Sequence, residues 1–186
     1  MFSWDGCRGA AATRYGRNRK GARGPHADRR THFESLENRL ALHSSVVIAE
    51  VMYHPPAASD IELSLAPEAV SSDFEFLELF NPSGTESISL LNKQLIGDVQ
   101  FTFPDEQLGP GEAAVLVSDP TAFVARYGDT ARILGTWEGT LNDDQVEVNL
   151  LDDDGHEVVD LQLAVNELWP FRADGIGSSL ELVDRS

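Results

Sequence analysis

From Val46 to the end of the chain, short apolar runs rich in β-branched and aromatic residues alternate with clusters of Gly, Pro, Asn and Asp. This pattern is typical of an all-β domain, because a strand needs only about four to eight residues and the turns need residues with unusual backbone freedom. The expected strands cover residues 46–53, 74–80, 87–96, 99–103, 113–117, 146–150, 159–165 and 179–183. About eight or nine strands of this kind predict an immunoglobulin-like β-sandwich.

Only one segment has a helical pattern. Asp119 is a good N-cap, Pro120 suits the first helical position and Gly128 can end the helix, which predicts a short helix over residues 120–127. A single helix argues against alternating β-α-β units. Residues 57–72 show no strong pattern and are expected to form a polar loop.

The first 43 residues differ from the rest in composition. They are rich in Gly, Ala and Arg, lack apolar periodicity, and contain 9 basic and 4 acidic residues. We therefore expect residues 1–43 to be a disordered basic leader and residues 44–186 to form one folded domain. The apolar stretch at 40–42 is too short for a secretory signal, and no run of about 18 apolar residues predicts a membrane span.

The folded part is strongly acidic, since residues 44–186 contain 5 basic and 27 acidic residues, a net charge of −22. Such a surface repels phosphate backbones, so nucleic acid is not expected as a partner of the domain. A protein partner, a cell-envelope component or a divalent cation is compatible with it. The single cysteine, Cys7, lies in the leader, and no feature of the sequence assigns an oligomeric state.

A short element at 29–42 is similar to an F-E-x-L-E-x-R-x-L element found near the start of many large exported proteins of certain bacteria. The matching residues are Phe33, Glu34, Leu36, Glu37, Arg39 and Leu40. The resemblance implies export, to the cell envelope or the extracellular space. It also leads us to expect that residues 1–28 come from an over-long start assignment.

Eight short phrases in the acidic part occur in the order that they have in the lamin-tail domain of bacterial surface and secreted proteins. The phrases cover residues 48–55, 76–82, 101–104, 108–111, 127–128, 135–142, 169–170 and 173–182. This resemblance implies an immunoglobulin-like sandwich with no catalytic activity of its own. Two departures stand out: the segment 57–72 is long, which predicts a local insert, and the chain ends right after the last expected strand, which predicts a fragment or an unusually short member.

Residues that enzymes use are present, but not in catalytic patterns. The five histidines show no short pairing of the kind that binds zinc. Gly177-Ser178-Ser179 is not a nucleophile elbow, and Gly175-Ile176-Gly177 lacks the third glycine of a phosphate-binding loop. We therefore predict a protein that is not an enzyme and carries no cofactor.

Calcium is the one metal ion with a candidate site. Asp152, Asp153 and Asp154 place three carboxylates on one turn, and calcium prefers oxygen ligands. The alternative is an ordinary hairpin turn, which the following Gly155 favours. A second acidic set at 142–144 lies roughly 26 Å away along a strand and cannot share the ion.

Three glutamates stand among the apolar residues of the first two strands. Glu75 and Glu78 fall on opposite faces of the strand 74–80, and Glu50 lies in the strand 46–53. We expect them to pair across strands, with a shared cation as the alternative.

Four aromatic residues could form either part of the core or an exposed platform for sugar. They are Tyr127, Trp137, Trp169 and Phe171. Because a tryptophan in a sandwich usually packs inside, we expect the core.

These observations lead to three hypotheses of function. The first is an interaction or scaffolding module of an exported bacterial protein that binds protein or cell-envelope material through its acidic face or sheet edges. The second is an accessory domain that serves a catalytic neighbour, of the phosphodiesterase, nuclease or kinase type. The third is a calcium-dependent carbohydrate-binding sandwich.

Overall fold

The computed structural model describes residues 45–164 and 171–181. The basic leader with its element at 29–42, Trp169 and the last residues of two expected strands lie outside this part of the chain. Among the described residues, neither helix has the length and apolar character that a membrane crossing needs.

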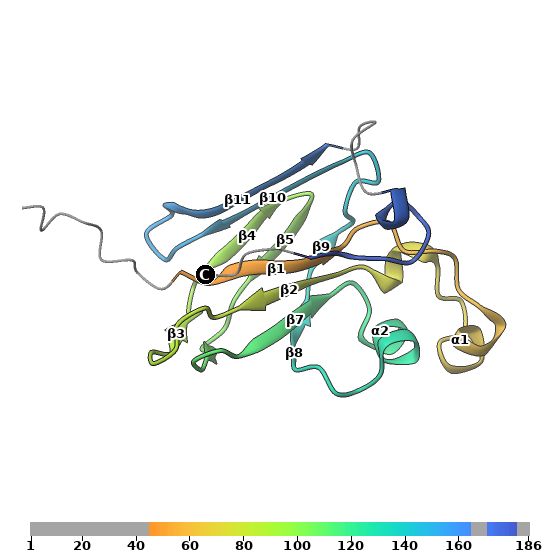
Figure 1. Cartoon of the computed structure of the whole chain (residues 1–186), viewed down its shortest axis with the longest axis horizontal. Coiled ribbons are helices and arrows are strands. Elements are labelled where there is room, and N and C mark those ends of the chain that lie inside the picture. The colour runs from red at the N-terminus through yellow and green to blue at the C-terminus, as the bar shows by residue number, and fades with distance from the viewer. Residues whose placement is uncertain (1–44, 165–170, 182–186) are drawn as a thin grey trace, which may run out of the picture. The chain divides into compact units, whose positions relative to one another are not determined.

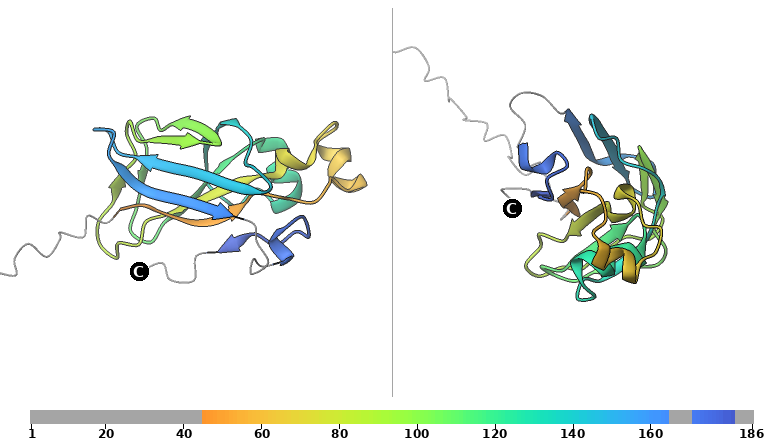
Figure 2. Two further views of the ribbon diagram at one scale, coloured as in Figure 1. Left: turned by 90° about the horizontal axis from the view of Figure 1, so that it is seen from above. Right: turned by 90° about the vertical axis from the view of Figure 1, so that its right-hand side faces the viewer.

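Two five-stranded sheets pack face to face, which confirms the predicted immunoglobulin-like β-sandwich (Figure 1, Figure 2). The first sheet has the order β12 (Leu180–Glu181), β1 (Val47–Met52), β2 (Phe76–Phe80), β7 (Ala113–Val117) and β8 (Ile133–Thr136). The second has the order β11 (Glu157–Ala164), β10 (Gln145–Leu151), β4 (Gln94–Gly97), β5 (Val99–Thr102) and β9 (Glu138–Gly139). A separate two-stranded sheet joins β3 (Ile88–Ser89) and β6 (Gln107–Leu108).

The main core lies between the two sheets, because alternate side chains of each strand point inward. Leu77 and Leu79 of β2 meet Val148 and Leu150 of β10 in this core, and all four are fully buried. Trp137, which follows β8, belongs to the same core with only 5% of its surface exposed. The expectation that Trp137 is a core residue is therefore confirmed.

The predicted helix is α2 (Pro120–Tyr127), and it begins and ends as expected. The side chain of Asp119 accepts the N–H of Ala122 at 2.8 Å, and Gly128 caps the other end. The helix covers the outer face of the first sheet, where the ring of Phe123 packs edge-on against Phe76 at 5.5 Å between centroids.

The expectation of a single helix and of a loop over 57–72 was wrong. This segment forms the helix α1 (Asp60–Leu65) and a turn of 3-10 helix, η1 (Ser71–Phe74). A capping box begins α1: the Ser59 hydroxyl accepts the N–H of Glu62, and the Glu62 carboxylate accepts the N–H of Ser59 at 2.6 Å. Both helices lie at the same end of the sandwich, on the right in Figure 1.

Three strands were also missed: β6, β8 and β9. Strand β8 pairs in parallel with β7, so that β7, α2 and β8 form one β-α-β unit inside a sandwich that is otherwise antiparallel among the described strands. The single expected helix argued against β-α-β units that alternate along the chain. Among the described strands this β-α-β unit is isolated, so the prediction of no alternation holds. The hairpin predicted around residues 152–155 is present, as β10 and β11.

Candidate interaction surface

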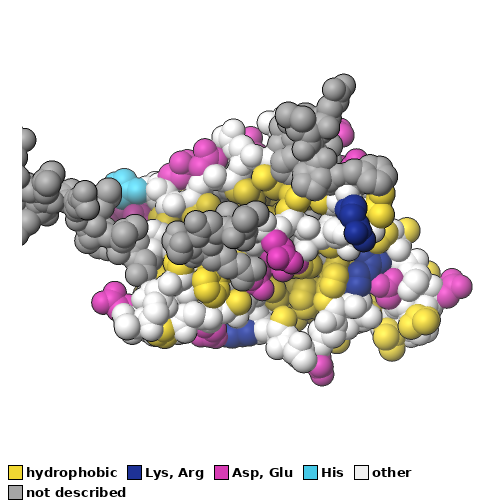
Figure 3. Space-filling model, viewed as in Figure 1, with side chains coloured by type: hydrophobic (Ala, Val, Ile, Leu, Met, Phe, Trp, Pro, Cys, Tyr) yellow, Lys and Arg dark blue, Asp and Glu magenta, His cyan; other side chains and the backbone are white. Residues whose placement is uncertain are grey.

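The helix α1 directs its aliphatic side chains to solvent. None of its six residues is buried, although three of them are aliphatic. Ile61 is 75% exposed and Leu65 is 60% exposed, and Val124 of α2 is 41% exposed. Residues four apart lie on one face of a helix, so Ile61 and Leu65 present a continuous apolar face. We call Ile61, Leu65 and Val124 the helix surface. Figure 3 shows apolar side chains gathered at the end of the sandwich that carries the helices, with acidic side chains beside them.

A single arginine holds α1 in place. Arg126 of α2 pairs with the Glu62 carboxylate at 2.6 Å, donates to the carbonyl of Pro56 at 3.0 Å, and stacks on the ring of Phe74 at 3.5 Å from its centroid. The hydrogen bond from Arg126 lowers the pKa of Glu62 to about 2, so the pair stays ionised at neutral pH. These polar contacts fix α1 while its aliphatic side chains stay exposed.

An apolar pocket of about 460 Å³ lies between the two helices. Its lining residues are Leu65 from α1 and Pro120, Thr121, Val124 and Ala125 from α2. Exposed apolar surface gathered in one place is a feature of protein interaction sites, whereas single exposed apolar side chains are ordinary.

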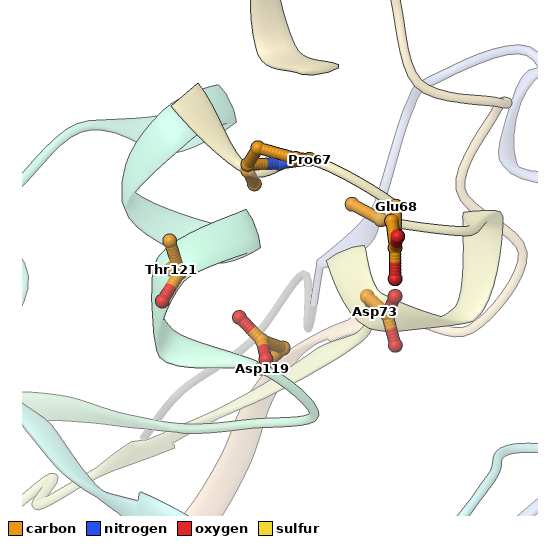
Figure 4. A pocket seen from close by; sticks show the side chains of 7 residues that line it. Pro67, Glu68, Asp73, Asp119 and Thr121 are labelled. Carbon is orange, nitrogen blue, oxygen red and sulfur yellow. The ribbon is translucent and has the colours of Figure 1, made fainter. Parts of the chain in front are cut away.

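Beside the apolar pocket lies a second hollow, of about 210 Å³ (Figure 4). It is lined by three carboxylates together with Ala66, Pro67, Ala69 and Thr121. We call Glu68, Asp73 and Asp119 the carboxylate hollow. Thr121 borders both the hollow and the apolar pocket, so the two are neighbours. One oxygen of Asp73 accepts the N–H of Val70 at 2.8 Å, and Asp119 caps α2, so both carboxylates are held in position.

Of the three glutamates expected in the first two strands, Glu50 lies in β1 and Glu78 in β2, and Glu75 lies between η1 and β2. Glu75 faces the core and is only 1% exposed, and its carboxylate accepts the N–H of Leu141 at 3.0 Å. Burial raises the pKa of Glu75 to about 8. Glu78 is directly opposite Glu50 in the sheet register. Glu50 and Glu78 are thus cross-strand neighbours, but two carboxylates do not form an ion pair with each other, and the Glu50 carboxylate accepts the hydroxyl of Ser179. Glu75 has a separate environment.

The histidine at the end of β1 has a structural role. The Nδ1 of His54 lies 2.8 Å from Asp174, and its Nε2 lies 3.8 Å from Asp143. These contacts link the stretch before β12, and the turn before β10, to the end of β1. No sequence signal pointed to this arrangement, because the three residues are far apart along the chain.

In each acidic turn a side-chain oxygen accepts backbone N–H groups of the same turn. In the turn at 142–144, the Oδ1 of Asn142 accepts the N–H groups of Asp144 at 2.9 Å and Gln145 at 3.2 Å. Asp152 accepts the N–H groups of Asp154 at 3.0 Å and His156 at 2.7 Å through one oxygen, and Asp153 and Asp154 are exposed. Within residues 45–164 and 171–181, no group of three or more His, Cys, Asp or Glu side chains is placed to hold a metal ion. Calcium binding by Asp152, Asp153 and Asp154 stays a prediction.

The comparisons with known proteins point to one family. The sequence model of the Lamin Tail Domain family matches residues 41–165, a range that includes both helices and every strand except β12. No curated protein matches the chain.

Proposed function

Because the chain belongs to the lamin tail domain family, an immunoglobulin-like fold that generally serves as a non-catalytic interaction module, we propose that it binds a protein partner through the helix surface. In this proposal the domain is a scaffolding module of an exported bacterial protein, located in the cell envelope or outside the cell. The support for export is the resemblance of residues 29–42 to the element found in exported proteins.

The observation that carries the proposal is the exposure of Ile61 and Leu65 on a helix with no buried residue. A helix of six residues gains little stability by itself, because helix nucleation is unfavourable and most helical stability comes from packing. Here polar contacts through Arg126 and the capping box hold the helix instead. An apolar face whose two aliphatic side chains are more than half exposed is then free for a partner.

A photo-crosslinking experiment tests this assignment. A photoreactive phenylalanine analogue replaces Ile61 in the full chain, and a second protein carries it at Ile96 of β4, which is 39% exposed. We expect a discrete crosslinked partner in cells of the producing bacterium from position 61 and none from position 96. Competition with excess wild-type chain removes the product, whereas competition with an Ile61→Asp, Leu65→Asp chain does not.

Stability measurements separate a binding defect from misfolding. Both substituted side chains are more than half exposed, so we expect the melting temperature of the Ile61→Asp, Leu65→Asp chain to stay close to that of the wild type. Equal crosslinking from positions 61 and 96, or competition by the substituted chain, would contradict the proposal. Cell fractionation with an antibody to the domain tests export separately.

A further inference from the structure

We infer that the segment bound by the helix surface is an apolar protein segment with a lysine or arginine beside its aliphatic side chains. This inference rests on the proposed function and adds the chemical class of the partner. It follows from the position of the carboxylate hollow next to the apolar pocket.

The two hollows share a border at Thr121. Leu65 ends α1 in the apolar pocket, and the next residues along the chain, Ala66 to Glu68, line the carboxylate hollow. A bound segment that places an aliphatic side chain against Leu65 and Val124 therefore places a neighbouring side chain next to Glu68 and Asp119.

The charge of the second hollow selects a cation. Glu68, Asp73 and Asp119 come from three different parts of the chain, and in Figure 4 the side chains of Glu68 and Asp73 point toward each other. The nearby cation among the described residues, Arg126, is engaged with Glu62 and the carbonyls of Pro56 and Ala57. Because three carboxylates line one hollow, their negative potential favours a partner's ammonium or guanidinium group there.

The hollow is also prepared for binding. Asp73 and Asp119 are each held by a backbone N–H, so little side-chain entropy is lost when a cation arrives. Apolar contact with the helix surface supplies the affinity, and the carboxylates select for charge and orientation.

The same charge argues against a lipid surface as the occupant. An apolar helix face can insert at a membrane interface, but such helices carry Lys and Arg that attract anionic lipids. Here the hollow next to the apolar pocket carries three carboxylates, which repel anionic headgroups. A basic protein segment is therefore the occupant that the observations favour.

Selection from a random peptide library identifies the preferred chemistry directly. The full wild-type chain is the bait. Peptides that also bind the Ile61→Asp, Leu65→Asp chain do not need the helix surface and are discarded. We expect the surviving peptides to carry Lys or Arg adjacent to Leu, Ile or Phe. Synthetic peptides from this pool are then compared with copies in which the basic residue is replaced by glutamine.

Neutral substitutions in the hollow complete the test. The Glu68→Gln, Asp73→Asn, Asp119→Asn chain keeps an oxygen for each backbone N–H and should melt like the wild type. We expect it to bind the basic peptide about tenfold more weakly, with less dependence on salt, and to bind the glutamine copy as the wild type does. A matched control changes three exposed carboxylates elsewhere, in the Asp105→Asn, Asp153→Asn, Glu157→Gln chain, and should leave the affinity unchanged.

The outcomes distinguish this inference from the proposed function. The partner class is wrong if the peptides that bind through Ile61 and Leu65 carry no basic residue. It is also wrong if basic peptides bind the chain with the neutralised hollow as tightly as they bind the wild type. In both cases the interaction surface stands. If no peptide depends on Ile61 and Leu65, the proposed function fails. Binding of the full chain to vesicles of anionic or zwitterionic lipid that is lost in the Ile61→Asp, Leu65→Asp chain would assign the surface to a membrane and overturn the inference.

Discussion

At the scale of single residues, Glu75 is the side chain whose environment conflicts most with its charge. Burial is the largest cause of its raised pKa, the carboxylates of Asp143, Asp73 and Asp98 add to it, and the hydrogen bond from the Leu141 N–H opposes it. A group whose pKa is raised on folding binds its proton more tightly in the folded state. Its contribution to stability is therefore complete below about pH 4.5 and declines as the pH rises to about 8.

Replacing Glu75 by glutamine should remove this pH dependence. We expect the free energy of unfolding of the wild type to fall between pH 5 and pH 8 by up to about 1.4 kcal/mol per pH unit, and that of Glu75→Gln to change less. Urea denaturation at several pH values measures the difference. Glu157→Gln, at an exposed position, is the control. Parallel profiles for the wild type and Glu75→Gln would show that Glu75 is ionised in the folded protein at neutral pH.

Gly97, at the end of β4, is a second residue whose identity is required by its position. Its φ is +117°, and an added Cβ would lie 2.2 Å from the carbonyl oxygen of Glu147, which is itself held by the N–H of Asp98 at 2.8 Å. We expect Gly97→Ala to lower the free energy of unfolding by about 2 kcal/mol or more. Gly84→Ala, where a Cβ meets nothing within 4 Å, should change it little. Equal denaturation midpoints for the two variants would rule out the close approach at Gly97.

At the scale of secondary structure elements, α1 depends on its ends rather than on buried apolar contacts. Loss of the capping box should therefore unfold the helix locally before it affects the domain. We expect Ser59→Ala to destabilise α1 by about 1 kcal/mol and to speed hydrogen exchange at the N–H groups of Leu63 and Ala66, which bond to Ser59 and Glu62. The control Ser64→Ala leaves the cap intact. Unchanged exchange in Ser59→Ala would mean that Arg126 alone is sufficient to hold the helix.

The elements that were predicted correctly are those with a strong local signal. Alternating apolar residues identified β10 and β11, and Asp119, Pro120 and Gly128 identified α2. The signal for α1 was present, since Ser59 and Glu62 have the spacing of a capping box, but Ile61, Leu63 and Leu65 alternate with polar residues, a pattern that favours a strand. Strand β8 was missed because all of its residues are half-buried or exposed and only pairing with β7 reveals it.

The candidate site could be predicted only in part. An acidic surface followed from composition, but Glu68, Asp73 and Asp119 line one hollow because α1, η1 and α2 pack together, and their spacing of up to 51 residues carries no signal. The exposure of Ile61 and Leu65 likewise depends on how Arg126 orients α1. Tertiary contacts of this kind follow from the fold and not from the local sequence.

At the scale of the whole molecule, the excess of negative charge dominates. Residues 44–186 have a net charge of −22, and mutual repulsion among carboxylates destabilises a compact state. Any salt screens this repulsion, over about 10 Å at 0.1 M ionic strength. Stabilisation by a calcium salt is therefore expected even without a calcium site, and only a comparison at equal ionic strength tests for one.

The acidic turn at Asp152, Asp153 and Asp154 is tested by melting the full chain with millimolar calcium, with magnesium at equal ionic strength, and with EDTA in matched salt. Calcium needs six to eight oxygen ligands, and one oxygen of Asp152 already accepts two backbone N–H groups. We therefore expect equal melting temperatures in the three solutions. A bound ion at 100 times its dissociation constant would add about 2.7 kcal/mol, which shifts the melting temperature by several degrees. A shift in calcium alone that is lost in Asp153→Asn, Asp154→Asn would show that an ion binds at this turn. Because the hydrogen bonds that Asp152 makes in the structure leave too few ligands, the turn would have to rearrange around that ion.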